Sequence, residues 1–168
     1  MAVRFVDLAV CDSYTGGKGE THMNTKNNFN FWWRWLVVAN AGVMLFGISL
    51  VLFPSLVRQG FSLMLFSFPS ALDAFPMEAV NYITLSHGVM GSVMFGWGAA
   101  MLFTLFSQFR AGDRIGWLTI AISLAVWYLP DTAISLWTGF WQNAVLNTVF
   151  IVLFAIPLAA TYKSFKRA

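Results

Sequence analysis

Long stretches without a charged side chain alternate with short charged segments along the chain. Three of these stretches have 23, 31 and 31 residues and cover positions 35–57, 79–109 and 132–162. A transmembrane helix needs about 20 largely apolar residues to cross a hydrocarbon core of about 30 Å, so each stretch is long enough for one span. A fourth stretch, 115–130, has 16 residues and ends at Asp131. Because 16 residues are few for a span, we expect this helix to continue through Asp131 to about Trp137.

The hydrophobic pattern predicts an all-α integral membrane protein with four transmembrane helices. The expected spans are about 33–53, 79–106, 115–137 and 141–162. They form a four-helix transmembrane domain of residues 31–168 behind an N-terminal tail of residues 1–30. Positions 12–30 of this tail are polar and glycine-containing, a composition typical of a disordered segment.

The connection between the first two spans, residues 54–78, is too apolar for an ordinary loop. Phe, Leu and Met dominate it, and Pro54, Pro69 and Pro76 interrupt it. Its uncharged part, 60–72, is too short to span a bilayer. We expect this outer connection to lie in the membrane interface or to re-enter the membrane, with packing against a partner's outer surface as the alternative.

Composition agrees with a membrane protein. Hydrophobic residues make up 58% of the chain and charged residues 10%, whereas about a quarter of the residues of a typical soluble domain are charged. A water-soluble globule is thereby excluded, and the high hydrophobicity also excludes a disordered chain. The single cysteine, Cys11, excludes an internal disulfide framework and a multi-cysteine metal site.

The distribution of basic residues predicts an orientation. Nine of the ten Lys and Arg residues lie between the N-terminus and Arg34, in the loop at 110–114 or at the C-terminus, and Arg58 is alone on the other side. Basic residues stay on the cytoplasmic side of a membrane. We therefore expect both termini in the cytoplasm, in a bacterial inner membrane or a photosynthetic membrane. The net charge of +3 then reflects topology and contact with anionic lipid, and not a nucleic-acid partner.

Tryptophans gather at the expected helix ends. They surround Arg34 at the start of the first span and bracket the turn between the last two spans: Trp32, Trp33, Trp35, Trp137 and Trp141. Amphipathic rings prefer the headgroup region, so these residues are expected to form a membrane-interface belt.

Small residues recur at every fourth position of the second span. They form a stripe on one face of the expected helix, which permits a close approach of another helix: Gly88, Ser92, Gly96 and Ala100. Two interpretations remain open. The stripe packs within this chain's own bundle, or it packs against a helix of a partner.

His87 is the one histidine inside an expected span. About 12 Å of helical rise separates it from Ala79, where the span begins. An ionisable residue inside a membrane is costly and is therefore a candidate functional residue. Gly91, one turn further on, would leave room for a flat ring, so His87 is a candidate axial ligand for haem or a chlorophyll-type pigment. The alternative is a neutral histidine bonded to Thr84, to the Ile83 carbonyl oxygen or to a neighbouring helix.

Asp131 is the second costly residue. It directly follows Pro130, which is expected to kink the third helix near its outer end. Polar residues at four-residue spacing share a helix face, and the short turn at 138–140 brings the faces of the last two helices together. We therefore expect an outer polar cluster of Arg58, Asp131, Ser135, Asn143 and Asn147.

Two roles for this cluster remain open. Arg58 pairs with Asp131 and pins the outer connection to the bundle, or Asp131 and His87 form a proton relay or a head-group site for a quinone. Asn40 lies in the inner half of the membrane, too deep to join them, and is expected to form a hydrogen bond between helices.

Familiar catalytic signatures are missing: the sequence has no glycine-rich phosphate loop, no HExxH and no GxSxG. In outline the chain resembles small four-helix bacterial membrane proteins, DoxX-like ones among them, without a motif that carries a residue role over. With so few polar residues inside the spans, we expect no enzyme. The first hypothesis is a non-catalytic accessory or scaffolding subunit of a larger respiratory or photosynthetic membrane complex, in contact with partner helices and lipids. The alternatives are a subunit that carries a pigment or haem on His87, and a small quinone- or lipid-binding protein.

Overall fold

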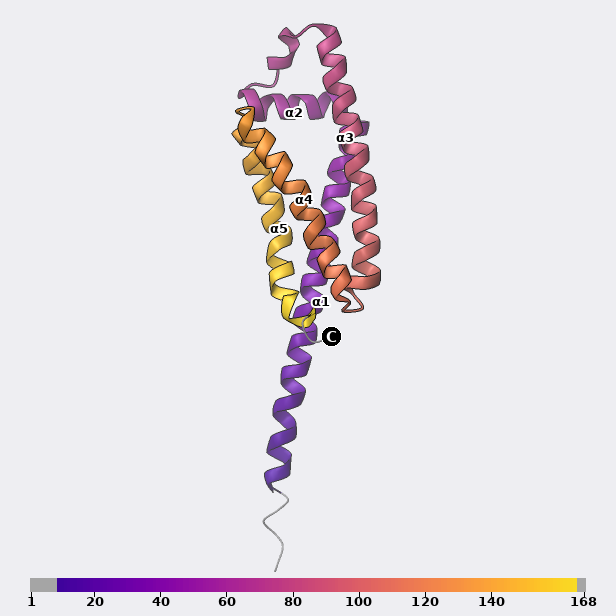
Figure 1. Ribbon diagram of the computed structural model, residues 1–168, viewed down its shortest axis with the longest axis vertical. Helices are drawn as coiled ribbons and strands as arrows, with labels where there is room; N and C mark the ends of the chain where they lie inside the picture. The colour runs from indigo at the N-terminus through magenta and orange to yellow at the C-terminus, as the bar shows by residue number, and fades with distance from the viewer. Residues whose placement is uncertain (1–8, 166–168) are drawn as a thin grey trace, which may run out of the picture.

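The computed structural model describes residues 9–165, which form an all-helical structure (Figure 1). Its four long helices are α1 (Ala9–Leu52), α3 (Met77–Thr104), α4 (Arg114–Trp137) and α5 (Trp141–Phe165). The outer connection contains a shorter helix, α2 (Pro54–Phe66), and a 3-10 turn, η1 (Ala71–Ala74), and α3 ends in a π-helical turn, η2 (Leu105–Phe109). Side chains are described from residue 27 onwards.

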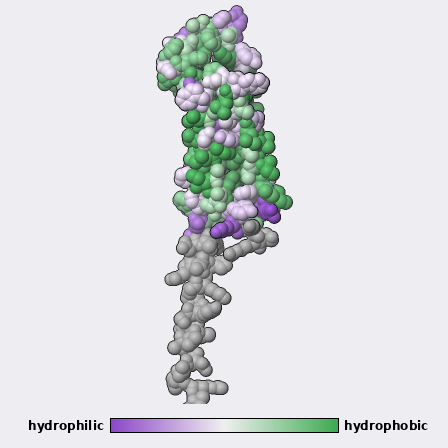
Figure 2. Space-filling model, turned by 60° about the vertical axis from the view of Figure 1, so that its left-hand side comes forward, coloured by the Kyte–Doolittle hydropathy of each residue, from purple (hydrophilic) through white to green (hydrophobic). Residues whose placement is uncertain are grey.

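Four segments are long and apolar enough to cross a membrane: Asn27–Leu52, Met77–Phe109, Arg114–Trp137 and Trp141–Phe165. The four predicted spans are thereby confirmed to within a few residues at each end, and the fold is that of a helical membrane protein. On the face that Figure 2 shows, the middle of the bundle is largely apolar, and the most hydrophilic residues lie at its two ends. We refer to the end with α2 and the α4–α5 turn as the α2 end, and to the opposite end as the Arg110 end.

The polar segment before the first span continues the first helix in the structure. α1 is continuous from Ala9 to Leu52, so positions 12–30, for which composition predicts disorder, prolong the transmembrane helix. In Figure 1 this part of α1 projects beyond the other helices at the Arg110 end. Extension of an existing helix needs no new nucleation, because each added residue gains a backbone hydrogen bond without the cost of a first turn.

α1 and α3 pack closely along the bundle, and glycines permit the contact. A Cβ atom added to Gly47 would lie 2.9 Å from the Gly91 carbonyl oxygen, and one added to Gly91 would lie 2.6 Å from Leu50 Cβ. Further along, Asn40 is completely buried and its Nδ2 donates a hydrogen bond to the Gly98 carbonyl oxygen at 2.8 Å. The expected hydrogen bond of Asn40 between helices is therefore confirmed.

The predicted stripe of small residues does not make this contact. Ser92, Gly96 and Ala100 are exposed, and no described atom lies within 4 Å of a Cβ built on Gly88 or Gly96. The interpretation that the stripe packs within the chain's own bundle is thus wrong. The glycines that pack, Gly91 and Gly98, are seven residues apart on another face of α3.

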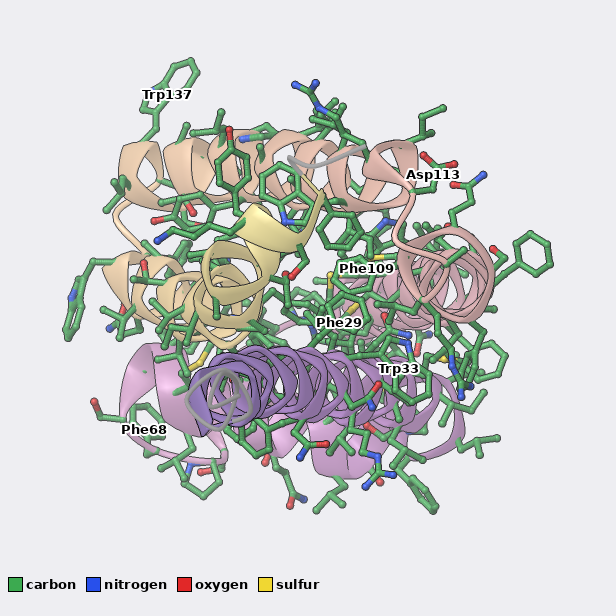
Figure 3. The ribbon with its side chains drawn as sticks, turned by 90° about the horizontal axis from the view of Figure 1, so that it is seen from below. Phe29, Trp33, Phe68, Phe109, Asp113 and Trp137 are labelled. Carbon is green, nitrogen blue, oxygen red and sulfur yellow. The ribbon has the colours of Figure 1, made fainter. Side chains whose placement is uncertain are left out.

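Aromatic rings fill the core at the Arg110 end (Figure 3). Phe109 stacks on Phe29 with ring centroids 5.9 Å apart and lies 4.8 Å from the ring of Phe165. The indole of Trp33 donates a hydrogen bond to the Leu105 carbonyl oxygen at 2.8 Å, and the Arg110 guanidinium lies over its ring at 4.6 Å. These contacts join α1, η2 and α5 into one core.

The predicted tryptophan belt divides into two groups. Trp33 and Trp35 both donate hydrogen bonds to carbonyl oxygens of other helices, Trp35 to that of Leu153 at 3.0 Å, and so take part in helix packing. Trp137 is 86% exposed and points away from the bundle in Figure 3. Of Trp33, Trp35 and Trp137, it is Trp137 whose side chain is exposed at a helix end, as an interface belt requires.

The glycine contact gives a stability prediction. Gly91→Ala places a methyl group against the backbone of α1, which cannot give way as a flexible side chain would, so we expect the free energy of unfolding to fall by about 1–3 kcal/mol. The matched control is Gly96→Ala, whose methyl group meets open space and should change stability by less than about 0.5 kcal/mol. Unfolding in mixed dodecyl maltoside and SDS micelles measures both, and equal effects would contradict the assigned packing face.

Candidate functional site: a cavity between α3, α4 and α5

The helices form two closely packed pairs, and the space between the pairs is not filled. α1 packs along α3 and α4 along α5, whereas α3 and α4 have few contacts beyond the turn that joins them. This turn is tight because Gly112 takes a positive φ of 79° and the Asp113 carboxylate accepts a hydrogen bond from the Ile115 N–H at 2.8 Å. From here α3 and α4 diverge towards the α2 end, and α2 lies across the bundle there (Figure 1).

A cavity of about 940 Å³ occupies this space, with walls from α1 to α5. It opens sideways, because Val93 of α3 and Val126 of α4 line it and are each 65% exposed. Both valines lie inside the segments that are long and apolar enough to cross a membrane, Met77–Phe109 and Arg114–Trp137. A molecule dissolved in lipid would therefore reach the cavity without crossing water.

Aromatic and aliphatic side chains make most of the cavity wall. The aromatic lining residues come from all five helices: Phe46, Phe61, Trp97, Trp127, Phe140, Phe150 and Phe154. Trp97 of α3 and Trp127 of α4 lie with ring centroids 6.2 Å apart and form a contact across the gap between the two helices. Pockets of this size and apolar character, with a few polar groups, are typical of small-molecule sites.

The polar groups of the cavity gather on α4 and α5. Asn143 Nδ2 donates to Ser135 Oγ at 2.8 Å and to Asp131 Oδ1 at 3.2 Å, and the Ser135 hydroxyl donates to the Asp131 carbonyl oxygen at 2.6 Å. Asn147 is 4% exposed, lines the cavity, and its Nδ2 has no hydrogen-bond partner among the described residues. The structure therefore brings together four of the five residues predicted for the outer polar cluster at one cavity.

Arg58 does not join the cluster. Within the described residues no ion pair connects Arg58 with Asp131, so the expected pair is not formed. The reason lies in the course of α2. The last turn of α2 contacts α5, because Gln142 Nε2 donates a hydrogen bond to the Leu65 carbonyl oxygen at 3.4 Å. Arg58 is about 10 Å of helical rise away from Leu65, towards the start of α2.

His87 lies on the opposite wall, on α3, and its ring stacks on that of Phe61 of α2 with centroids 4.8 Å apart and an interplanar angle of 21°. Its Nδ1 atom has no hydrogen-bond partner within the described part of the chain, so the expected bonds to Thr84 or to the Ile83 carbonyl oxygen do not form at this atom. The room that Gly91 was expected to leave for a macrocycle is filled by α1. The local argument for an axial ligand at His87 is thereby removed.

The aromatic lining was missed at the level of the sequence. Trp97 and Trp127 lie inside the expected spans 79–106 and 115–137, away from the helix ends where an interface belt would place them. A tryptophan in this position is a signal that could have pointed to a cavity, but only the helix angles show that the two rings face the same space. No three His, Cys, Asp or Glu residues of the described part are grouped as metal ligands.

No protein family, curated protein or solved structure matches the chain in the three comparisons made.

The hydrogen bonds of Asn143 give a second prediction. Asn143→Leu removes the donor that Asp131 Oδ1 and Ser135 Oγ share. We expect the free energy of unfolding to fall by about 1–2 kcal/mol, because interhelical hydrogen bonds in membranes contribute about 0.6 kcal/mol on average and up to 1.7 each.

Asn81→Leu on α3 is the matched control, since Asn81 is exposed and forms no side-chain hydrogen bond with the described residues. Its unfolding free energy should stay within about 0.5 kcal/mol of the original in the same micelle assay. If both leucine variants were equally stable, the polar cluster would not hold α4 and α5 together.

Proposed function

We propose that the protein binds a lipophilic molecule with a polar head, such as a quinone or a lipid, inside the membrane. The observation that supports this proposal is the cavity of about 940 Å³ that opens between α3 and α4, with aromatic walls and a polar cluster on one side. The walls would take the apolar body of the ligand. The cluster around Asp131 and the unpartnered amide of Asn147 would take its polar head.

The proposed orientation follows from the basic residues. Arg34, Arg110, Arg114 and Lys163 lie towards the Arg110 end, and among the described residues Arg58 is the basic residue of the α2 end. By the positive-inside rule the Arg110 end faces the cytoplasm. The polar cluster of the cavity then lies in the outer half of the bilayer, and α2 lies in the outer interface.

A blocked cavity tests the proposal. Ser123 lines the cavity from α4, so Ser123→Phe fills part of the space that a ligand needs. The purified chain in nanodiscs is titrated with decylubiquinone, which quenches tryptophan fluorescence, and Trp97 and Trp127 serve as reporters in the cavity wall. We expect saturable quenching whose Kd rises about tenfold or more in Ser123→Phe, because an overfilled pocket excludes its ligand.

The control is Ala133→Phe, which adds the same ring to an exposed position of α4 outside the cavity. Its Kd should stay within about twofold, since a surface substitution of this kind removes no ligand contact. Quenching that does not saturate, or that both phenylalanine variants leave unchanged, would show partition into lipid and refute the proposal.

An accessory or scaffolding role in a membrane complex is the second candidate, and the small-residue stripe favours it. Gly88, Ser92, Gly96 and Ala100 form a face of α3 that no other described helix covers. Within a membrane such a face permits the close approach of a second helix. The stripe lies beside the packed glycine face of α3, so that one helix would contact α1 on one side and a partner on the other.

Co-purification from mild detergent tests this role. Partner subunits should stay bound to the original chain and be lost from Gly96→Leu, because a leucine separates the two helices by more than the contact allows. Gly42→Leu is the matched control, on an exposed face of α1 where an added Cβ also meets no described atom. A single 18.8 kDa species in native mass spectrometry of the original chain would exclude the accessory role.

A further inference from the structure

One acidic residue, Asp131, lines the cavity, and no Lys or Arg of the described part of the chain does. The other titratable lining residue is His87, on the opposite wall. The carboxylate Oδ1 accepts a hydrogen bond from Asn143 Nδ2 at 3.2 Å, and the Ser135 hydroxyl, which donates to the Asp131 carbonyl oxygen, lies 3.5 Å from it. Both of these side chains are neutral. Arg58, the cation of the same end, forms no ion pair with Asp131 among the described residues.

A carboxylate without a counter-charge is costly at membrane depth. Neutral donors lower this cost, but they do not provide a positive charge. The same argument disfavours phosphate- or carboxylate-headed lipids as ligands, because their charge would face Asp131 in a cavity that no Lys or Arg of the described residues lines. Charge complementarity therefore selects a positively charged ligand.

The aromatic walls are suited to the same class of molecule. The faces of Phe and Trp rings carry negative electrostatic potential, so they attract cations as well as apolar groups, and Trp attracts them most strongly. Trp127 is one helical turn from Asp131 on α4, and both line the cavity together with Trp97 across the gap. Ring faces and a carboxylate thus border one space that is large enough for a drug-sized molecule.

From these observations we infer that the ligand is a lipophilic monovalent cation, an organic ion whose charge is embedded in aromatic or alkyl groups. Asp131 supplies the counter-charge, and Trp97 and Trp127 contact the apolar groups. The ion enters sideways between α3 and α4 from the lipid. This inference rests on the proposed ligand cavity, and it makes a cation the preferred ligand in place of a neutral quinone or an anionic lipid.

Two probes of similar shape and different charge test the inference. Tetraphenylphosphonium carries a positive charge, and triphenylphosphine oxide is neutral. Equilibrium binding of each is measured with the full chain in nanodiscs of zwitterionic lipid. We expect the cation to bind about tenfold or more tightly than the neutral probe, and Asp131→Asn to remove that preference, because loss of one charge of a buried pair weakens binding by this order or more.

Two further variants make the result specific. Asp131→Glu keeps the charge and should retain the preference, whereas Asp73→Asn, at an exposed position of η1 outside the cavity, removes a charge elsewhere and should leave it unchanged. If Asp131→Asn does not fold, the comparison of the two probes on the original chain decides. Equal affinity of that chain for both probes, or an unchanged preference in folded Asp131→Asn, overturns the inference.

The outcomes also separate this inference from the proposed function. Saturable binding of decylubiquinone or triphenylphosphine oxide, sensitive to Ser123→Phe, without preference for the cation would leave a ligand cavity and refute its charge selectivity. Absence of saturable binding for every probe would refute both.

Discussion

The close contact of α1 with α3 at Gly47 and Gly91 determines where the other helices can lie. It brings the two backbones together so tightly that neither position accepts a side chain, and Asn40 adds a buried hydrogen bond further along the same interface. α3 is thereby fixed to α1, while α4 leaves the tight turn at Gly112 and packs on α5. The cavity is the space that remains between these two pairs, so its width depends on the glycine contact although no glycine lines it.

The sequence predicted the spans well and the helix faces poorly. Uncharged stretches fix the length and number of membrane helices because charge is costly in lipid, and this constraint acts on each segment separately. The packing face of α3 depends on which other helix approaches it. Gly88 and Gly96 fit the four-residue rule better than Gly91 and Gly98, which are seven residues apart, yet α1 packs on the second pair.

The candidate site was predictable in part for the same reason. Asp131, Ser135 and Asn143 lie near a short turn, where local spacing decides which side chains meet, and their hydrogen bonds follow the prediction. His87 and Arg58 were placed by depth alone. Depth in the membrane does not tell which way a side chain points around its helix, or where α2 runs. For this reason the space expected beside His87 at Gly91 is filled by α1, and the expected ion pair of Arg58 with Asp131 is not formed among the described residues. The contact between Trp97 and Trp127 depends on how α3 and α4 are arranged, and no local sequence pattern predicts that arrangement.

Because the cavity opens sideways, the concentration that would govern ligand binding is the concentration in the bilayer and not that in water. Val93 and Val126 line the cavity and are exposed on the side of the bundle, so a ligand of the proposed kind would arrive from the bilayer and not from water. Occupancy then follows the mole fraction of the ligand among the lipids, and a compound that partitions strongly into membranes can saturate the site at a low aqueous level. Two compounds with equal affinity for the cavity walls would differ in apparent potency by the ratio of their partition coefficients. For the proposed ligand, the bilayer would be the reservoir from which the cavity is filled.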